Sequence, residues 1–291
     1  MKARLFFSVV AMLLLASCTE DTYFELKDEY RPAEKAVFSA FMENYKKTRT
    51  GISTYPISGY YSLFWTRGDA ISIYDGRNTA VFTTENDNSS FAEFVLAEGQ
   101  IDDDASEYKA FYPSTITVYN QELPAVQHYI KDNVENFPMY AHSQNKDLEF
   151  KNLCGIIQLR LKNGSDSPIR VSSIGLSSVN SGMSGTFQIG GDGAAEVEGR
   201  EGVSLICEEP VSLYEFAGTD FNIIVPQGEY DPLRVDLHLA DGKVMQLAST
   251  DKVHVKRSGM TRIEMTLSES SYESSLEMIP VTEADVDFTD R

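Results

Sequence analysis

Four histidines and one run of aspartates are the side chains best suited to metal binding or acid–base chemistry. The histidines are His128, His142, His238 and His254. None of them stands at metal-ligand spacing from another histidine or from a cysteine. Residues 102–104 are adjacent aspartates whose carboxylates point in different directions on an extended chain, as in a solvated loop. The sequence also lacks G-x-S-x-G and a phosphate-cradling glycine loop. We therefore expect no catalytic residue, no metal and no cofactor.

A different chemistry is available at the thiol of Cys18. A basic amino end, residues 1–4, precedes an apolar run that starts at Leu5, and Ala16 and Ser17 lead directly to Cys18. This order is typical of a secretory signal. The apolar run is shorter than the roughly 20 residues that a helix needs to cross a bilayer. The amino end therefore predicts export rather than a membrane-spanning helix.

The segment that ends at Cys18 resembles the lipobox of diacylated bacterial lipoproteins. The resemblance implies a signal peptide at residues 1–17, cleavage between Ser17 and Cys18, and a lipid on the Cys18 thiol that anchors the protein in the outer membrane. The acids Glu20 and Asp21 resemble a signal for export to the cell surface, and a solvated acidic linker is the alternative. A plain signal peptide with an incidental cysteine is the alternative to lipidation.

The net charge limits the possible partners of the protein, and the cysteine content limits how its fold can be stabilised. The chain has 44 acidic and 25 basic side chains and a formal net charge of −19 at pH 7. Such a surface repels phosphate backbones, so we expect no nucleic-acid partner. Cys154 and Cys207 could form a disulfide in an oxidising compartment or remain buried thiols. The fold must therefore rest on the burial of apolar side chains.

Short alternating segments separated by turn residues dominate the chain. The clearest is 233–239, in which apolar and polar residues alternate, and Asp241-Gly242 predicts a hairpin with residues 243–247. Asp75-Gly76 predicts another turn. Helical periodicity is nearly absent, so parallel strands joined by crossover helices are not expected. The pattern predicts an all-β protein of the sandwich or barrel type.

The strands fall into two series, each long enough to close its own core. The first series defines an N-terminal β-sandwich domain at residues 36–147, and the second a C-terminal β-sandwich domain at 148–268. An acidic tether at 18–35 precedes them, and a tail at 269–291 follows. At the start of the first domain, the pattern of 37–41 permits either a strand or an amphipathic helix.

A series of short motifs, in order along the chain, resembles the fimbrillin-like proteins, the type V pilin subunits of Bacteroidales. The motifs are Val37–Ala40, Thr48–Thr50, Trp65–Tyr74, Tyr108–Pro113, Leu123–Gln127, Phe137–Ala141 and Phe150–Gly155. The resemblance implies two tandem transthyretin-like antiparallel β-sandwich domains. It also implies a non-enzymatic subunit or accessory of a cell-surface fimbria, in the stalk, at the tip or at the anchor, that supports adhesion.

In the polymerising members of this family, a protease cuts after an arginine and removes the first strand. The resemblance places the cut between Arg49 and Thr50, in a basic segment suited to trypsin-like cleavage. The displaced strand would contain Val37, Phe38, Ala40 and Phe41. A strand from another subunit would then add to the exposed edges by β-augmentation. The alternative is that Arg49 merely faces solvent.

The tail offers a candidate for the strand that another subunit would accept. Ala284, Val286 and Phe288 alternate strictly with other residues, although Asp285 and Asp287 dilute the apolar pattern. A frayed end or an edge strand is the alternative. The partners implied by the resemblance are other fimbrial subunits, bound by β-strand addition, and a host or bacterial surface receptor.

A surface glycan-binding lipoprotein of a polysaccharide-uptake system is the alternative function. Such proteins bind sugars on exposed aromatic side chains, and the chain has 15 tyrosines. Tyr55, Tyr60 and Tyr61 are the candidates near the amino end. Glycan binding would appear as affinity of the uncut monomer, whereas a polymerising subunit would assemble after proteolysis.

Overall fold

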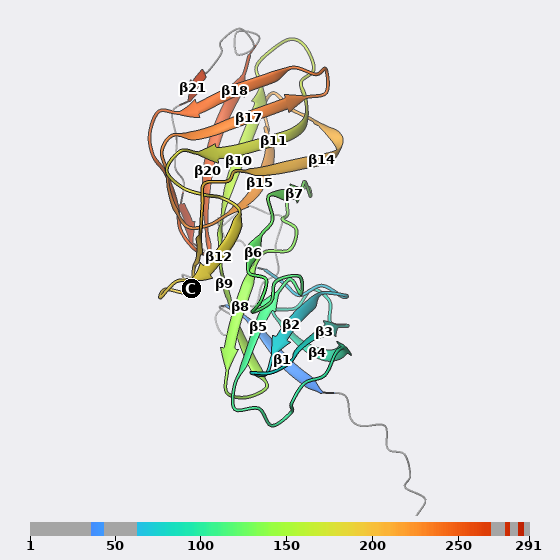
Figure 1. Ribbon diagram of the computed structural model, residues 1–291. Coiled ribbons are helices and arrows are strands. Elements are labelled where there is room, and N and C mark those ends of the chain that lie inside the picture. Colours follow the sequence, from blue (N-terminus) through green and yellow to red (C-terminus); the bar gives the residue numbers. More distant parts are fainter. Residues whose placement is uncertain (1–35, 44–62, 269–276, 280–284, 288–291) are drawn as a thin grey trace, which may run out of the picture. The chain divides into compact units, whose positions relative to one another are not determined.

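Strands make up every regular element that the structure describes. The computed structural model describes residues 36–43, 63–268, 277–279 and 285–287 (Figure 1). The prediction of an all-β protein is confirmed. Within the described ranges, no helix is long and apolar enough to span a membrane.

The strands of the first half close into a barrel. Around the ring, their order is β1 (Val37–Met42), β4 (Phe91–Glu98), β3 (Thr79–Thr84), β2 (Ala70–Tyr74), β5 (Tyr108–Tyr112), β8 (Met139–Ser143) and β9 (Asp147–Asn152). Neighbouring strands are antiparallel except at the closure, where β1 pairs in parallel with β9. Alternate residues of each strand face inward, which is why the period-2 pattern specifies a core.

Aromatic side chains fill the interior of this barrel. Trp65, the only tryptophan of the chain, is fully buried. Its ring makes edge-to-face contacts with Phe94, Tyr112 and Phe150, with centroids 5.0, 5.4 and 5.3 Å apart. Such contacts add to the stabilisation from area burial. Trp65 therefore serves the core.

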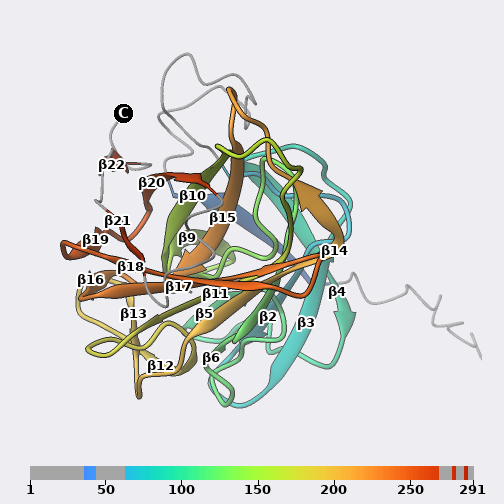
Figure 2. The same cartoon turned by 90° about the horizontal axis from the view of Figure 1, so that it is seen from above.

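The second half contains a four-stranded and a six-stranded sheet. The first has the order β15 (Thr219–Val225), β10 (Gly155–Asn163), β20 (Gly259–Leu267), β22 (Asp285–Asp287). The second has the order β21 (Glu277–Ile279), β18 (Val244–Ser249), β17 (Leu233–Leu239), β11 (Arg170–Ser178), β14 (Val203–Ser212), β7 (Val126–His128). Figure 2 shows β18, β17 and β11 side by side. Residues such as Leu159 and Leu237 share one buried core.

Smaller sheets complete this half. One contains β13 (Ala195–Val197), β12 (Gly185–Ile189) and β6 (Glu122–Leu123), and another contains β16 (Gly228–Tyr230) and β19 (Val253–Val255). The hairpin predicted at Asp241-Gly242 joins β17 to β18. β6 and β7 come from the predicted first domain but pair with β12 and β14 of the second half. Residues 35–291 form one compact unit, and the division into two domains stays a prediction.

Among the strands that the structure describes, four pairs are parallel, although the sequence predicts antiparallel sandwiches. They are β1–β9, β10–β20, β14–β7 and β18–β21. The absence of crossover helices excludes only parallel strands that are close in sequence. Here, the paired strands are separated by other strands, from β19 and β20 between β18 and β21 to the strands β11 to β19 between β10 and β20, and local periodicity does not reveal such a connection.

The turn between β2 and β3 is organised by the carboxylate of Asp75. Its Oδ1 accepts hydrogen bonds from the backbone N–H groups of Arg77 (2.7 Å) and Asn78 (2.6 Å). Its Oδ2 accepts from the N–H of Asp102 (2.8 Å) and from the Asn78 side chain (3.1 Å). Burial acts to raise the pKa of Asp75, but these hydrogen bonds outweigh it and lower the pKa to about 2.

We expect Asp75→Ala to destabilise the protein at pH 7 by about 2–3 kcal/mol, because the lowered pKa links ionisation to folding. The pKa of an unfolded aspartate is about 3.9. The stabilisation is therefore fully present above pH 4 and is lost as the pH falls towards 2. Urea unfolding of both proteins along this pH range measures the difference. Asp241→Ala, at an exposed turn aspartate, is the matched control and should have a small effect. A difference for Asp75 that does not shrink with acid would contradict the assignment.

Candidate functional site at strand β1

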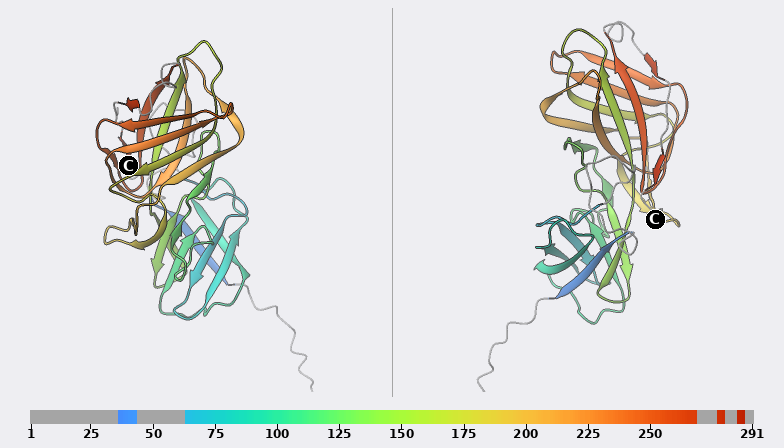
Figure 3. Two further views of the ribbon diagram at one scale, coloured as in Figure 1. Left: turned by 45° about the horizontal axis from the view of Figure 1, so that its top comes forward. Right: turned by 180° about the vertical axis from the view of Figure 1, so that it is seen from behind.

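Strand β1 holds the closed barrel together along two edges. It pairs antiparallel with β4, where Phe38 lies opposite Phe94, and parallel with β9, where Met42 lies opposite Phe150. Figure 3 shows β1 in blue at the barrel. Of the two conformations that the sequence permitted, the structure contains the strand.

The inward face of β1 supplies three buried side chains of different size. Phe38 and Ala40 are fully buried, and Met42 is 7% exposed. The Phe38 ring contacts Phe82 and Tyr108 edge to face, with centroids 5.0 and 4.9 Å apart. The position that β1 occupies between β4 and β9 is called the seat of β1 below. It accepts an aromatic, a small and a long apolar residue in that order.

The outward face of β1 is more exposed. Val37 is 40% exposed, and Phe41 packs its ring against Phe91 with centroids 5.1 Å apart. Of the residues predicted for the displaced strand, Phe38 and Ala40 therefore fill the core, whereas Val37 and Phe41 lie on the outer surface of the barrel.

Glu43, the residue after β1, is held by a cluster of hydrogen-bond donors. Its carboxylate accepts from Nη1 and Nη2 of Arg257 at 2.7 and 2.9 Å. It also accepts from the Ser258 hydroxyl and from the backbone N–H of Asn152, both at 3.0 Å. The Arg257 and Glu43 side chains are 18% and 16% exposed. Arg257 thus binds Glu43 through two charge-assisted hydrogen bonds, which are stronger than hydrogen bonds between neutral groups.

A cavity of about 210 Å³ lies beside the carboxyl end of β1. Met42, Phe137 and Met139 line it together with polar groups, among them Asp69 and Tyr112. The Tyr112 hydroxyl donates a hydrogen bond to Asp69 Oδ1 at 2.9 Å. Burial raises the pKa of Asp69 and outweighs the opposing hydrogen bonds from Thr66 and Tyr112.

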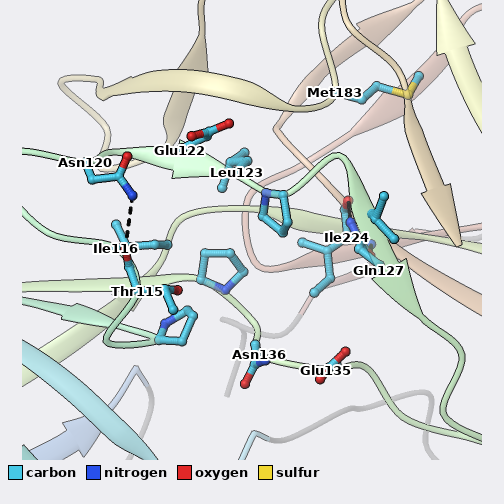
Figure 4. Close-up of a pocket in the computed structure, with 14 residues that line it drawn as sticks. Thr115, Ile116, Asn120, Glu122, Leu123, Gln127, Glu135, Asn136, Met183 and Ile224 are labelled. Carbon is cyan, nitrogen blue, oxygen red and sulfur yellow. Dashed lines mark hydrogen bonds between the residues drawn. The ribbon is translucent and has the colours of Figure 1, made fainter.

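A second concavity, of about 310 Å³, lies at β6 and β7 (Figure 4). Gln127 lines it, and its amide forms two hydrogen bonds with the backbone of Ile224: Nε2 donates to the carbonyl at 2.7 Å, and Oε1 accepts from the N–H at 2.9 Å. Asn120 Nδ2 likewise donates to the Thr115 carbonyl at 3.3 Å. These polar side chains hold the local backbone together, so β1 remains the stronger functional candidate.

A search of solved structures finds proteins from Bacteroides and Porphyromonas species that are similar to this chain. A "putative cell adhesion protein" from Bacteroides ovatus matches 88% of this chain and 99% of its own, with 13% identity and a TM-score of 0.50. The present chain shares that fold. The all-β fold expected from the fimbrillin-like resemblance agrees with this match, whereas the two tandem domains stay a prediction. No protein-family model and no curated protein gives a match.

Two further structures are similar over comparable lengths. A "putative cell adhesion protein" from Bacteroides uniformis matches 88% of this chain and 98% of its own, with 16% identity and a TM-score of 0.48. The tip fimbrial protein Mfa3 from Porphyromonas gingivalis, with a C-terminal truncation, matches 86% and 98%, with 9% identity and a TM-score of 0.36.

Several predicted site residues lie outside the described residues. These are Ser17, Cys18, Arg49, Thr50, Ala284 and Phe288, together with Tyr55, Tyr60 and Tyr61. Val286 lies in β22, which pairs with β20 at the position of Met260. The predicted donor segment thus includes a strand at the edge of the chain's own four-stranded sheet.

The two cysteines after Cys18 are both free thiols. Cys154 is fully buried and Cys207 is 7% exposed. Burial raises the pKa of both thiols, to about 11 for Cys207. A raised pKa disfavours the reactive thiolate. Of the two alternatives left open by the sequence, the structure contains the buried thiols.

The sequence did not predict the contact between Glu43 and Arg257. The two residues are 214 positions apart, and each is followed or preceded by other polar residues. The one local signal is that Glu43 stands directly after the alternating apolar residues of β1. A carboxylate at that point implies a partner or solvent, but nothing in the sequence identifies Arg257 as the partner.

Proposed function

We propose that this protein is a structural, non-enzymatic subunit or accessory of a cell-surface fimbria that supports adhesion and assembles by strand exchange at β1. The observation that carries the proposal is the seat of β1, a strand paired along both edges whose buried residues complete an aromatic core. Removal of β1 would leave the edges of β4 and β9 unpaired. Such edges accept another strand readily.

In this proposal, strand exchange starts with a proteolytic cut after Arg49. Arg49 follows β1 in the basic segment at residues 46–49, so a cut after it separates β1 from the rest of the chain. The fold shared with the Bacteroides ovatus protein, which is named for cell adhesion, supports the same class of function. In this proposal, the uncut chain keeps its own strand and stays monomeric.

Limited digestion with an arginine-specific protease tests the proposal. We expect one early cut after Arg49, followed by release of the peptide that contains β1 and growth of the product into a ladder of oligomers. Mass spectrometry identifies the cut, and size-exclusion chromatography follows the assembly. Arg49→Gln should abolish both, whereas Arg31→Gln, at an arginine that precedes Pro32, is the matched control and should change neither. A cut product that stays monomeric would instead favour an anchor or tip subunit, or a glycan-binding lipoprotein.

We further propose that a lipid on Cys18 anchors the protein in the outer membrane, with the folded part at the cell surface. Two acyl chains hold a protein on a membrane stably. Cys18→Ala should therefore abolish incorporation of labelled palmitate and move most of the protein from the membrane to the soluble fraction. Cys207→Ala is the matched control and should leave both unchanged. Retention of label in the Cys18 variant would contradict this anchor.

A further inference from the structure

The donors around Glu43 are arranged by contacts that do not involve Glu43. Arg257 Nη1 donates to the Asn152 carbonyl at 3.0 Å and to the Ser258 hydroxyl at 3.3 Å. Asn152 Nδ2 donates to the same hydroxyl at 3.0 Å, and the Ser258 N–H donates to the Cys154 carbonyl at 2.9 Å. Asn152 ends β9, and Arg257 and Ser258 precede β20, so all of these groups belong to parts of the chain that follow residue 49.

Removal of β1 would take away the carboxylate but leave its donors. Glu43 lies before Arg49 and would leave with β1, whereas Arg257 would remain at the end of the vacated seat. Both the Arg257 guanidinium, which is 18% exposed while β1 is in place, and the backbone N–H of Asn152 would lose the acceptor that Glu43 supplies, and a returning carboxylate would restore these charge-assisted contacts. An incoming strand that carries a carboxylate at this position satisfies them.

We propose that Arg257, Ser258 and the backbone N–H of Asn152 form a carboxylate-binding site that selects the strand entering the seat of β1. This inference rests on the proposed function. Its ligand is a peptide strand from a second polypeptide, with an aromatic, a small and a long apolar residue at alternate positions and a glutamate directly after the last of them. The site thus adds a charge requirement to the apolar pattern.

The site also sets the direction of the incoming strand. β1 runs parallel to β9 and antiparallel to β4, and Glu43 follows the carboxyl end of β1. A strand that entered in the opposite direction would bring its amino end to Arg257. The chain's own tail has the alternation Ala284, Val286, Phe288, but threonine follows Phe288. We therefore expect a peptide from the tail to bind more weakly than one with the sequence of β1.

A competition experiment on the full chain tests this site. The chain is cut after Arg49 with its own strand still bound, and a labelled peptide with the sequence of residues 35–45 is exchanged into it. Unlabelled peptides then compete for the seat. We expect Glu43→Gln in the competing peptide to weaken binding about 10- to 100-fold, because a partly buried, charge-assisted pair is lost. Because only the peptide changes, folding of the protein is unaffected.

Two controls separate the site from a general effect of charge. A peptide with both Glu43→Gln and Asn44→Glu keeps the net charge but moves the carboxylate by one residue, and it should bind as weakly as Glu43→Gln alone. In a chain with Arg257→Gln, the native and Glu43→Gln peptides should bind with nearly equal affinity. If the native and the Glu43→Gln peptides competed equally for the unaltered chain, the carboxylate site would be overturned, whereas strand exchange would not. Failure of every peptide to exchange would instead contradict the proposed function.

Discussion

Replacing Phe38 by alanine should destabilise the uncut chain by about 3–5 kcal/mol, the usual cost of removing a buried phenylalanine. The side chain is fully buried, and its ring meets Phe82 and Tyr108 edge to face. The cavity would lie between β1 and the opposite wall of the barrel, where the closed ring limits relaxation. Urea unfolding of the full chain, followed by tryptophan fluorescence from Trp65, measures the loss.

Val37→Ala is the matched control on the same strand. Val37 is 40% exposed, so its truncation should cost less than about 1 kcal/mol. A peptide with the sequence of β1 should show the same ranking when it competes for the cut chain, because the same side chain fills the same seat. Equal costs for the two substitutions would mean that the inward face of β1 does not contribute to the core, and would undermine the proposed strand exchange.

Local signals along the sequence predicted several of the strands but not how distant strands pair to close the barrel. The hairpin at Asp241-Gly242 was predicted because its turn and both strands are neighbours in sequence. The pairing of β1 with β9 was not, because the two strands are separated by five other strands of the same barrel and each has only a local alternation. Nothing in such an alternation specifies which distant edge it meets.

The candidate site likewise has one part that the sequence predicted and one part that it did not. The alternation of residues 37–41 permitted either a strand or a helix, and the resemblance to a known family marked this short segment as the displaced strand. The donors that hold Glu43 come from the end of β9 and from the turn before β20. Their meeting depends on how the barrel and the four-stranded sheet are connected through Asn152–Gly155, which no local pattern describes.

Gly155→Ala should be among the most destabilising substitutions in this connection, at about 3 kcal/mol. A Cβ atom at Gly155 would overlap the carbonyl oxygen of Lys256, approach Val255 Cγ1 to 2.6 Å and approach the Gly259 carbonyl oxygen to 3.1 Å. The end of a flexible side chain could rotate away from the added Cβ atom, but backbone atoms cannot. Either β10 or the turn at residues 256–259 must move, and this turn carries Arg257.

The same displacement gives the substitution a second, functional consequence. If the turn moves, the guanidinium of Arg257 moves with it, and the peptide with the sequence of β1 should lose its preference over the Glu43→Gln peptide. Gly191→Ala is the matched control, since a Cβ there meets nothing within 4 Å and should change neither stability nor peptide preference. Urea unfolding and peptide competition on the two variants measure both effects. A Gly155 variant that lost stability but kept the peptide preference would show that β10 moves and the turn at residues 256–259 does not. The position of Arg257 would then not depend on the close approach at Gly155.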